Sequence, residues 1–260
     1  LTYGELAGLV PRQSIETPPD PSGPCHLCPE ASAGVLAFLW TNPTTGYYIL
    51  SDTGAATVDQ SVFRLNRDDD SGYLLSYHAA GVSLLGSARI EQKAACHCSG
   101  KPVPSQEELE RFRVLKEKGP HDVHLQWAIA ETEEELSREW MVPLLKTKQK
   151  LGHGWKAPLR EARILYVGGG HDELHEDALC AALKDKALFG LDGLCLERIG
   201  MPVPDDFEKK PKPEWMSRLC VAYGLSYHLL NLPGIILPDE VSDAKIPAAS
   251  HANSFVSKEH

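Results

Sequence analysis

The sequence predicts an α/β fold, and three patterns lead to this prediction. Residues 47–78 have the alternation and the turns of a three-stranded antiparallel meander. Residues 162–186 give a buried strand, three consecutive glycines and a helix in direct succession. Between these two units lie two helix-start signals, near Ser105 and Thr132. Strands and helices mixed in this way indicate layers of helix packed on a sheet.

Composition limits the classes of partner. The chain has 260 residues, of which 42% are hydrophobic and 24% charged, which is enough for one large domain or two small ones. A formal net charge of -10 disfavours nucleic acid as a partner. No apolar run approaches the roughly 18 residues of a membrane span, and no signal peptide is evident at Leu1. We therefore expect a cytoplasmic chain that does not enter a membrane, and one that has been trimmed, since it starts without Met.

The first half of the chain begins with a predicted loop. Residues 1–28 are rich in Pro, and residues 35–39 form an apolar run typical of a short buried helix. Strands are expected at 47–51 and 58–65, joined by a polar hairpin tip. A second turn at 66–72 then leads into a strand at 73–78.

The second half is predicted to be mostly helical. Ser105 with Glu108 and Thr132 with Glu135 fit the capping box, in which each side chain satisfies a free backbone N–H at a helix start. Pro143 is expected to kink the second helix. A buried strand at 162–167, a helix at 172–186 and a helix at 214–223 follow, and residues 233–260 are predicted to form a tail.

The hairpin tip carries the pattern Asp52-x-Gly54-x-x-Thr57-x-Asp59. Backbone N–H groups of such a turn can cradle phosphate oxygens, and carboxylates hold Mg²⁺ through its retained waters. The simpler interpretation is that Asp and Gly are favoured in turns for local reasons.

Gly168, Gly169 and Gly170 form the second candidate element. Glycines between a strand and a helix allow a nucleotide to approach the backbone, and a helix N-terminus favours negative charge. An ordinary strand-to-helix turn is the alternative.

Five segments, in this order, resemble the ATPase domain of the actin and seventy-kilodalton heat-shock chaperone superfamily. Residues 48–63 are similar to its second phosphate-binding hairpin. The other four resemble its connecting helix, the glycine turn after the meander, the adenosine-binding strand with its glycine turn, and the closing helix: residues 29–33, 80–86, 164–170 and 215–226.

The resemblance implies a ribonuclease-H-like (actin-type) α/β subdomain at 29–91 and 151–232 with an inserted helical subdomain at 92–150. It also implies ATP and Mg as cofactors. Gly54, Ala55, Ala56 and Thr57 would hold phosphates and Asp52 and Asp59 the water shell of Mg²⁺, which Glu30 would also contact. Gly86 and the turn Gly168–Gly170 would line the nucleotide site. Asp52, Thr57, Asp59 and Glu30 are the implied catalytic residues.

Two departures keep other functions open. Ala55 and Ala56 stand where the chaperones usually have Gly, and the family's first phosphate hairpin, Asp-x-Gly-Thr, is not found in residues 1–46. We therefore expect only the second lobe, a poor ATPase alone, which needs the missing first lobe of the same protein as its partner. The alternatives are a non-catalytic regulatory or interaction module, with a possible protein client, and a sugar-kinase-like member of the superfamily.

A zinc site is a further open question. Cys25 and Cys28 have the spacing of half a zinc site, and Cys96 and Cys98 flank His97. Seven Cys in a chain with no secretion signal are otherwise expected to be reduced thiols.

Overall fold

The structure is a computed structural model that describes residues 29–41, 43–68, 72–119, 121–170, 173–191, 197–205, 210–226 and 233–242. Cys25 and Cys28, the entry segment 1–28 and most of the predicted tail lie outside these residues.

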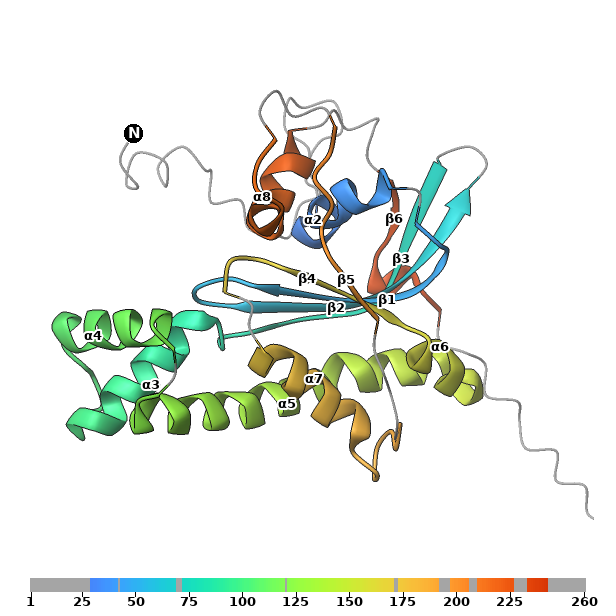
Figure 1. Cartoon of the computed structure of the whole chain (residues 1–260). Coiled ribbons are helices and arrows are strands. Elements are labelled where there is room, and N and C mark those ends of the chain that lie inside the picture. The colour runs from blue at the N-terminus through green and yellow to red at the C-terminus, as the bar shows by residue number, and fades with distance from the viewer. Residues whose placement is uncertain are drawn as a thin grey trace, which may run out of the picture.

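A six-stranded sheet with the order β5-β4-β1-β2-β3-β6 forms the centre of the fold (Figure 1). Strands β1 (Gly46–Thr53), β2 (Val58–Asp68) and β3 (Gly72–Ser83) form the antiparallel meander predicted from the sequence. β4 (Arg163–Val167) pairs parallel to β1, and β5 (Glu197–Ile199) pairs parallel to β4. This order and these directions are those of the ribonuclease-H-like fold, so the predicted fold class is confirmed. β6 (Gly234–Ile236) extends the sheet beside β3.

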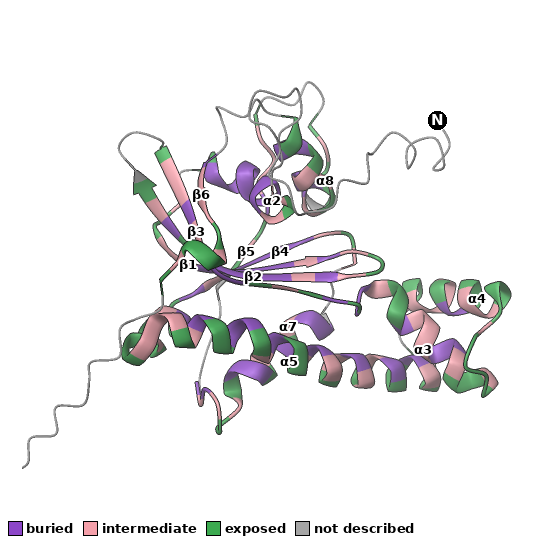
Figure 2. Cartoon of the chain, turned by 180° about the vertical axis from the view of Figure 1, so that it is seen from behind, coloured by how far each residue is buried: buried purple, intermediate pink, exposed green. Residues whose placement is uncertain are grey.

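Helices cover both faces of the sheet (Figures 1 and 2). α2 (Glu30–Leu39) and α8 (Pro213–Leu225) lie on one face. α5 (Val123–Leu151) and α7 (Glu173–Lys184) lie on the other. α3 (Ser87–Ser99), α4 (Gln106–Glu117) and the first part of α5 extend beyond the end of the sheet. Short helices complete the described chain: η1 (Gly152–Gly154), α6 (Lys156–Arg160) and η3 (Pro238–Glu240).

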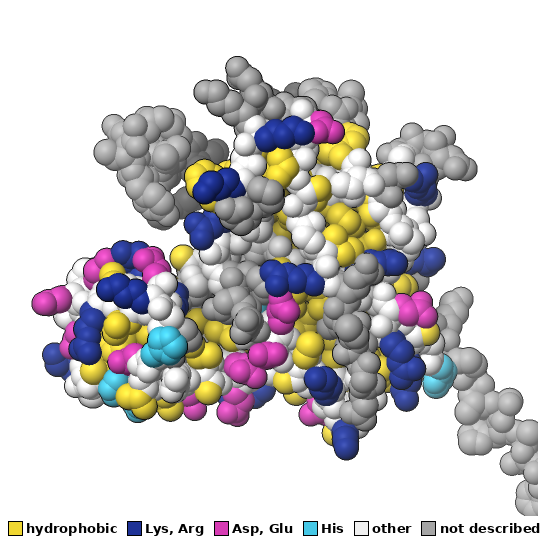
Figure 3. Space-filling view, viewed as in Figure 1, with side chains coloured by type: hydrophobic (Ala, Val, Ile, Leu, Met, Phe, Trp, Pro, Cys, Tyr) yellow, Lys and Arg dark blue, Asp and Glu magenta, His cyan; other side chains and the backbone are white. Residues whose placement is uncertain are grey.

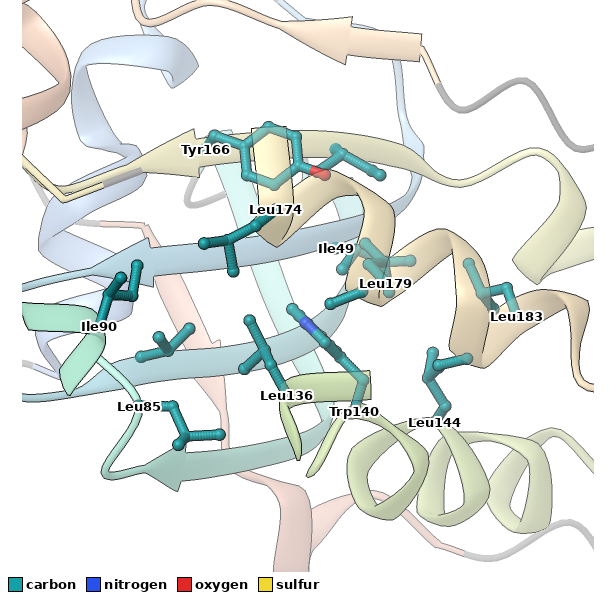
Figure 4. Close-up of a cluster of buried hydrophobic side chains, with 14 of the residues drawn as sticks. Ile49, Leu85, Ile90, Leu136, Trp140, Leu144, Tyr166, Leu174, Leu179 and Leu183 are labelled. Atoms are coloured by element: carbon teal, nitrogen blue, oxygen red, sulfur yellow. The ribbon is translucent and has the colours of Figure 1, made fainter. Parts of the chain in front are cut away.

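The alternation of side chains along β1 produces two hydrophobic cores. Tyr48 and Leu50 join the core under α2 and α8, whereas Ile49 joins the core under α5 and α7. Trp140 of α5 is fully buried in this second core, close to Ile49 and Leu179 (Figure 4). The sheet is thus held from both sides, which fixes the positions of its strand ends.

The structure corrects several predicted boundaries. Thr132 does not start a helix: α5 begins at Val123, where the Asp122 carboxylate accepts hydrogen bonds from the N–H groups of His124 and Leu125. Thr132 lies inside the helix, where its hydroxyl donates to the Ala128 carbonyl and caps no helix start.

Strand ends also differ from the prediction. β2 runs on to Asp68 and β3 to Ser83, so Gly81 lies in a strand and not in the predicted glycine turn. The helix α3 and the two three-residue strands β5 and β6 have no counterpart in the sequence prediction. Among the described residues, no helix combines the length and the hydropathy that a membrane crossing requires.

Candidate functional site

Two carboxylates lie side by side at the ends of β1 and β2. Asp52 and Asp59 are cross-strand partners, and only residues 54–57 lie outside the two strands. Both residues therefore belong to rigid strand ends rather than to the polar hairpin tip. The Thr57 hydroxyl, on the connecting loop, donates to Asp59 Oδ2 over 3.3 Å.

A third carboxylate, Glu30 at the start of α2, acts on Asp52 through its charge. Burial, with the negative charges of Glu30 and Asp59, raises the pKa of Asp52 to about 6. Burial also raises the pKa of Asp59, while the hydrogen bond from Thr57 acts in the opposite direction. Asp52, Thr57 and Asp59 thus lie together, with the charge of Glu30 acting on Asp52, and such a concentration of negative charge can attract a cation.

The loop 54–57 is fixed by the N-terminus of α3. The N–H groups of Gly86, Ser87 and Ala88 donate to the carbonyls of Ala56, Gly54 and Ala55, over 3.1, 3.0 and 2.9 Å. A Cβ atom at Gly86 would stand 2.5 Å from backbone atoms of this loop. Only glycine permits such an approach, which explains Gly86 without invoking a ligand.

The direction of these carbonyls determines where the loop's own N–H groups point. In a trans peptide the C=O and the following N–H point in opposite directions. Because the carbonyls of Gly54, Ala55 and Ala56 face α3, the N–H groups of Ala55, Ala56 and Thr57 face away from it. Ala55 and Ala56 are exposed. Three successive N–H groups aimed at open space form a cradle for an anion.

The glycine turn after β4 packs directly on the end of β1. Gly168 has a φ of +86°, and a Cβ atom there would stand 2.2 Å from the Thr53 carbonyl oxygen. The Gly170 N–H donates to this same carbonyl over 2.9 Å. A Cβ atom at Gly170 would stand 2.8 Å from the Gly54 carbonyl oxygen. The loop 54–57 and the glycine turn 168–170 therefore lie side by side, where β1 and β4 end.

Arg218 lies beside this turn, and no role was predicted for it from the sequence. Arg218 of α8 lies over Gly169, and its guanidinium donates to the Gly169 carbonyl over 3.3 Å. The side chain is exposed. The spacing between Gly169 and Arg218 is 49 residues, so no local sequence pattern could have joined them.

All of these groups lie at one end of an α/β sheet. The parallel strands β1 and β4 end at this edge, and ligands of open α/β sheets bind beyond the carboxyl ends of such strands. An anion cradle, a carboxylate group for a cation and a glycine turn with an arginine stand there together.

Comparison with known proteins gives structural similarity only. No family model and no curated protein matches the sequence. A PilM–PilN type IV pilus biogenesis complex matches with a TM-score of 0.48 and 18% identity, over 77% of this chain and 52% of that one. A ParM filament from Clostridium botulinum matches with a TM-score of 0.45 and 19% identity, over 78% and 53%.

An archaeal actin homolog in complex with ADP matches with a TM-score of 0.43 and 13% identity, over 76% of this chain and 54% of that one. The chain spans about half the length of each of these structures. These neighbours have the actin-like fold, and the fold assignment itself rests on the strand order described above. The heat-shock chaperone branch of the resemblance stays a prediction.

Proposed function

We propose that this chain is the ATP-binding lobe of an actin-like ATPase. The observation that carries the proposal is the loop 54–57, whose three consecutive N–H groups face away from α3 because its carbonyls are bound to residues 86–88. Such a cradle suits the β- and γ-phosphates of a nucleotide. Its backbone is held before any ligand arrives, which lowers the entropy cost of binding.

The carboxylates Asp52 and Asp59 would hold Mg²⁺ through its waters, and Glu30 would contact the same water shell. Mg²⁺ prefers oxygen ligands and keeps most of its waters, so a carboxylate pair beside a phosphate cradle fits it. When bound, Mg²⁺ neutralises phosphate charge. The raised pKa of Asp52 supports this assignment: burial and the repulsion from Glu30 and Asp59 both disfavour its charge, and a nearby cation would offset them.

Adenosine would lie against the turn Gly168–Gly170, beside the guanidinium of Arg218. A planar cation of this kind can stack on a purine or bind its polar edge. Gly168 and Gly170 must be glycine because a side chain there would collide with the chain's own backbone. Gly169 and Arg218 are therefore the residues of this turn that we expect to face the adenosine.

In the proposed reaction a water attacks the γ-phosphorus, the bond from that phosphorus to the bridging oxygen breaks, and ADP leaves. Asp52 or Asp59 would orient the water, and Thr57 would position Asp59 through its hydrogen bond. A first lobe with its own phosphate hairpin would close the other side of the nucleotide, so we expect the present chain to hydrolyse ATP poorly by itself.

A non-catalytic module with the same fold is the second candidate. The observation that favours it is that Gly86, Gly168 and Gly170 are all explained by contacts with the chain's own backbone. The carboxylates would then be structural residues at strand ends.

Titration calorimetry of the whole chain with ADP and Mg²⁺ distinguishes the two candidates. We expect saturable binding weaker than about 1 μM, since one side of the site is open. Asp52→Asn together with Asp59→Asn should abolish the Mg²⁺ dependence, whereas Glu107→Gln on exposed helix α4 should not change it. Absence of any Mg²⁺-dependent binding up to millimolar nucleotide would favour the non-catalytic module.

A further inference from the structure

Two histidines far apart in the sequence meet on the helices beyond the end of the sheet. His97 lies in the last turn of α3 and His124 in the first turn of α5. Their Nδ1 atoms are 3.1 Å apart. Histidine side chains lie on the surface of this part of the molecule, drawn in cyan in Figure 3.

Aromatic neighbours hold both rings in place. The His97 ring stacks on Trp127, with centroids 4.1 Å apart and an interplanar angle of 24°. The His124 ring meets the edge of Phe112, which is fully buried. Side chains from α3, α4 and α5 thus fix the two imidazoles relative to each other.

We propose that His97 and His124 form a binding site for a first-row divalent metal ion such as Zn²⁺, Ni²⁺ or Cu²⁺. Two nitrogens that bind one such ion at about 2.0 Å each stand roughly 2.8 to 3.3 Å apart for ligand angles of about 90° to 110°. The observed separation of 3.1 Å falls within this range. Without metal, the Nδ1–H of one neutral ring donates to Nδ1 of the other. When a metal binds both Nδ1 atoms, this proton moves to Nε2 of its own ring, so both imidazoles stay neutral.

Three cationic side chains line the hollow beside His97: Arg89, Lys93 and Lys101. Arg89 donates a hydrogen bond to Gln92, and the two lysines are paired with carboxylates. Lys93 is paired with Glu135 at 2.8 Å and Lys101 with Glu108 at 3.8 Å. The carbonyls at the C-terminus of α3 favour a positive charge near His97, whereas the N-terminus of α5 disfavours one near His124.

Solvent has access to the pair. His97 is exposed, and a hollow of about 610 Å³ lies beside it, lined in part by Arg89, Gln92, Cys96 and Trp127. Within the described residues no group of three His, Cys, Asp or Glu side chains is placed to hold a metal. Two imidazoles would therefore supply the protein ligands, and water or an added ligand would take the other positions. Imidazole ligands suit all three ions, and Cu²⁺ generally binds more tightly than Ni²⁺ or Zn²⁺.

This site differs from the cysteine-based zinc site considered from the sequence. The structure pairs His97 with a histidine, and Cys98 on the same helix is a free, exposed thiol. Cys96 points its thiol at the Pro102 carbonyl, at 3.6 Å.

The test follows tryptophan emission of the full chain during titration with Ni²⁺ at pH 7.5, because Ni²⁺ quenches an indole next to it and Trp127 stacks on one ligand. We expect saturable quenching with one equivalent of metal, competed by Zn²⁺. His97→Gln and His124→Gln should each weaken it at least 10-fold, and His153→Gln, which alters an exposed histidine elsewhere, should leave it unchanged. Trp127→Phe should remove the signal while calorimetry still detects the metal.

Thermal melts of each variant establish that it is folded, and His97→Gln is the safer variant because its side chain is exposed. The proposal is overturned if no saturable quenching occurs, in which case the pair is only a hydrogen bond between α3 and α5. It is also overturned if quenching survives both histidine variants, or if Cys96→Ser with Cys98→Ser removes it while both histidines remain.

Discussion

Asp52 faces Asp59 across β1 and β2, and only Asp59 receives a hydrogen bond from Thr57. The two carboxylates are therefore not equivalent. Burial, together with the repulsion from Glu30 and Asp59, raises the pKa of Asp52 to about 6. For Asp59 the Thr57 hydroxyl partly offsets the effect of burial. Of these two carboxylates, Asp52 is therefore the one whose negative charge destabilises the folded state more.

Replacing Asp52 by Asn should stabilise the protein in the absence of metal, in a pH-dependent manner. The pKa of Asp52 rises from 3.8 to about 6 on folding, so the folded state binds the proton more tightly. The cost of its charge is absent below about pH 4 and grows as the pH rises to about 6. We expect Asp52→Asn to gain roughly 1 to 2 kcal/mol at pH 7.5, after allowance for solvent screening, and nothing at pH 4.

Urea unfolding at the two pH values measures this difference. Asp239→Asn, on a short exposed helix, is the matched control and should give no gain at either pH. Equal gains at pH 4 and pH 7.5 would show that the effect comes from packing and not from charge.

A methyl group at Gly168 should be far more costly than one at Gly154. At Gly168 the φ of +86° disfavours any side chain, and the Cβ atom would meet the Thr53 carbonyl at 2.2 Å. Neither backbone can move without disturbing the sheet, so we expect Gly168→Ala to destabilise by roughly 2 to 4 kcal/mol. At Gly154 a Cβ atom would meet nothing within 4 Å. Denaturant melts should show Gly154→Ala within about 0.5 kcal/mol of the parent, and a mild Gly168→Ala would contradict the described contact.

The sequence could predict the parts of the fold that depend on local patterns. Strand alternation at 47–78 marks the meander because Tyr48 and Leu50 face one core and Ile49 the other. The capping box at Ser105 is present as predicted, with both of its hydrogen bonds. Local patterns failed where tertiary packing decides, as at Thr132, whose hydroxyl is satisfied inside a long helix.

Short strands at the sheet edges were beyond prediction for the same reason. Three residues are too few for a hydrophobic period, so β5 and β6 are defined only by the strands beside them. For the candidate site, the hairpin motif supplied the strand-end residues and the resemblance added Glu30, and their roles stay predictions. The contact of Arg218 with Gly169 could not be predicted because it depends on the packing of α8.

The corrected start of α5 can be tested at its cap. Asp122 accepts hydrogen bonds from two free N–H groups of the first turn, so Asp122→Ala should cost about 1 kcal/mol of stability. Asp122→Asn keeps an acceptor oxygen and should cost clearly less. Both are compared by chemical unfolding. A helix that began at Thr132 would leave Asp122→Ala without effect, so an unchanged midpoint would refute the observed boundary.

Site residues and core residues should respond differently to substitution. Thr57→Ala alters the connecting loop and Asp59→Asn a partly exposed strand end, and for both we expect weaker Mg²⁺-dependent nucleotide binding with little loss of stability. Val62 and Ile164 are buried at 0% and 2% exposure. Val62→Ala and Ile164→Ala should cost roughly 1 to 4 kcal/mol, with binding retained while the protein is folded. Calorimetry beside thermal melts separates the two classes, and full nucleotide binding by Asp59→Asn would remove that carboxylate from the site.

Binding of Mg²⁺ with nucleotide should release a proton from Asp52. Near pH 6 about half of the Asp52 carboxyl groups are protonated, because the pKa is raised to about 6. A divalent cation held through water beside this carboxylate lowers the pKa again, so binding should drive the proton off and should tighten between about pH 5 and pH 7.

Calorimetry at pH 6 in two buffers of different ionisation enthalpy measures the release, to which we expect Asp52 to contribute about half a proton per ligand. The terminal phosphate of ADP also titrates near pH 6, so the protons that belong to Asp52 are the difference between wild type and Asp52→Asn. Asp52→Asn should release about half a proton less and bind more weakly at pH 7, whereas Asp239→Asn should change neither. If wild-type protein releases no more protons at pH 6 than Asp52→Asn does, the cation does not lie near Asp52, and the proposed arrangement of the metal site is wrong.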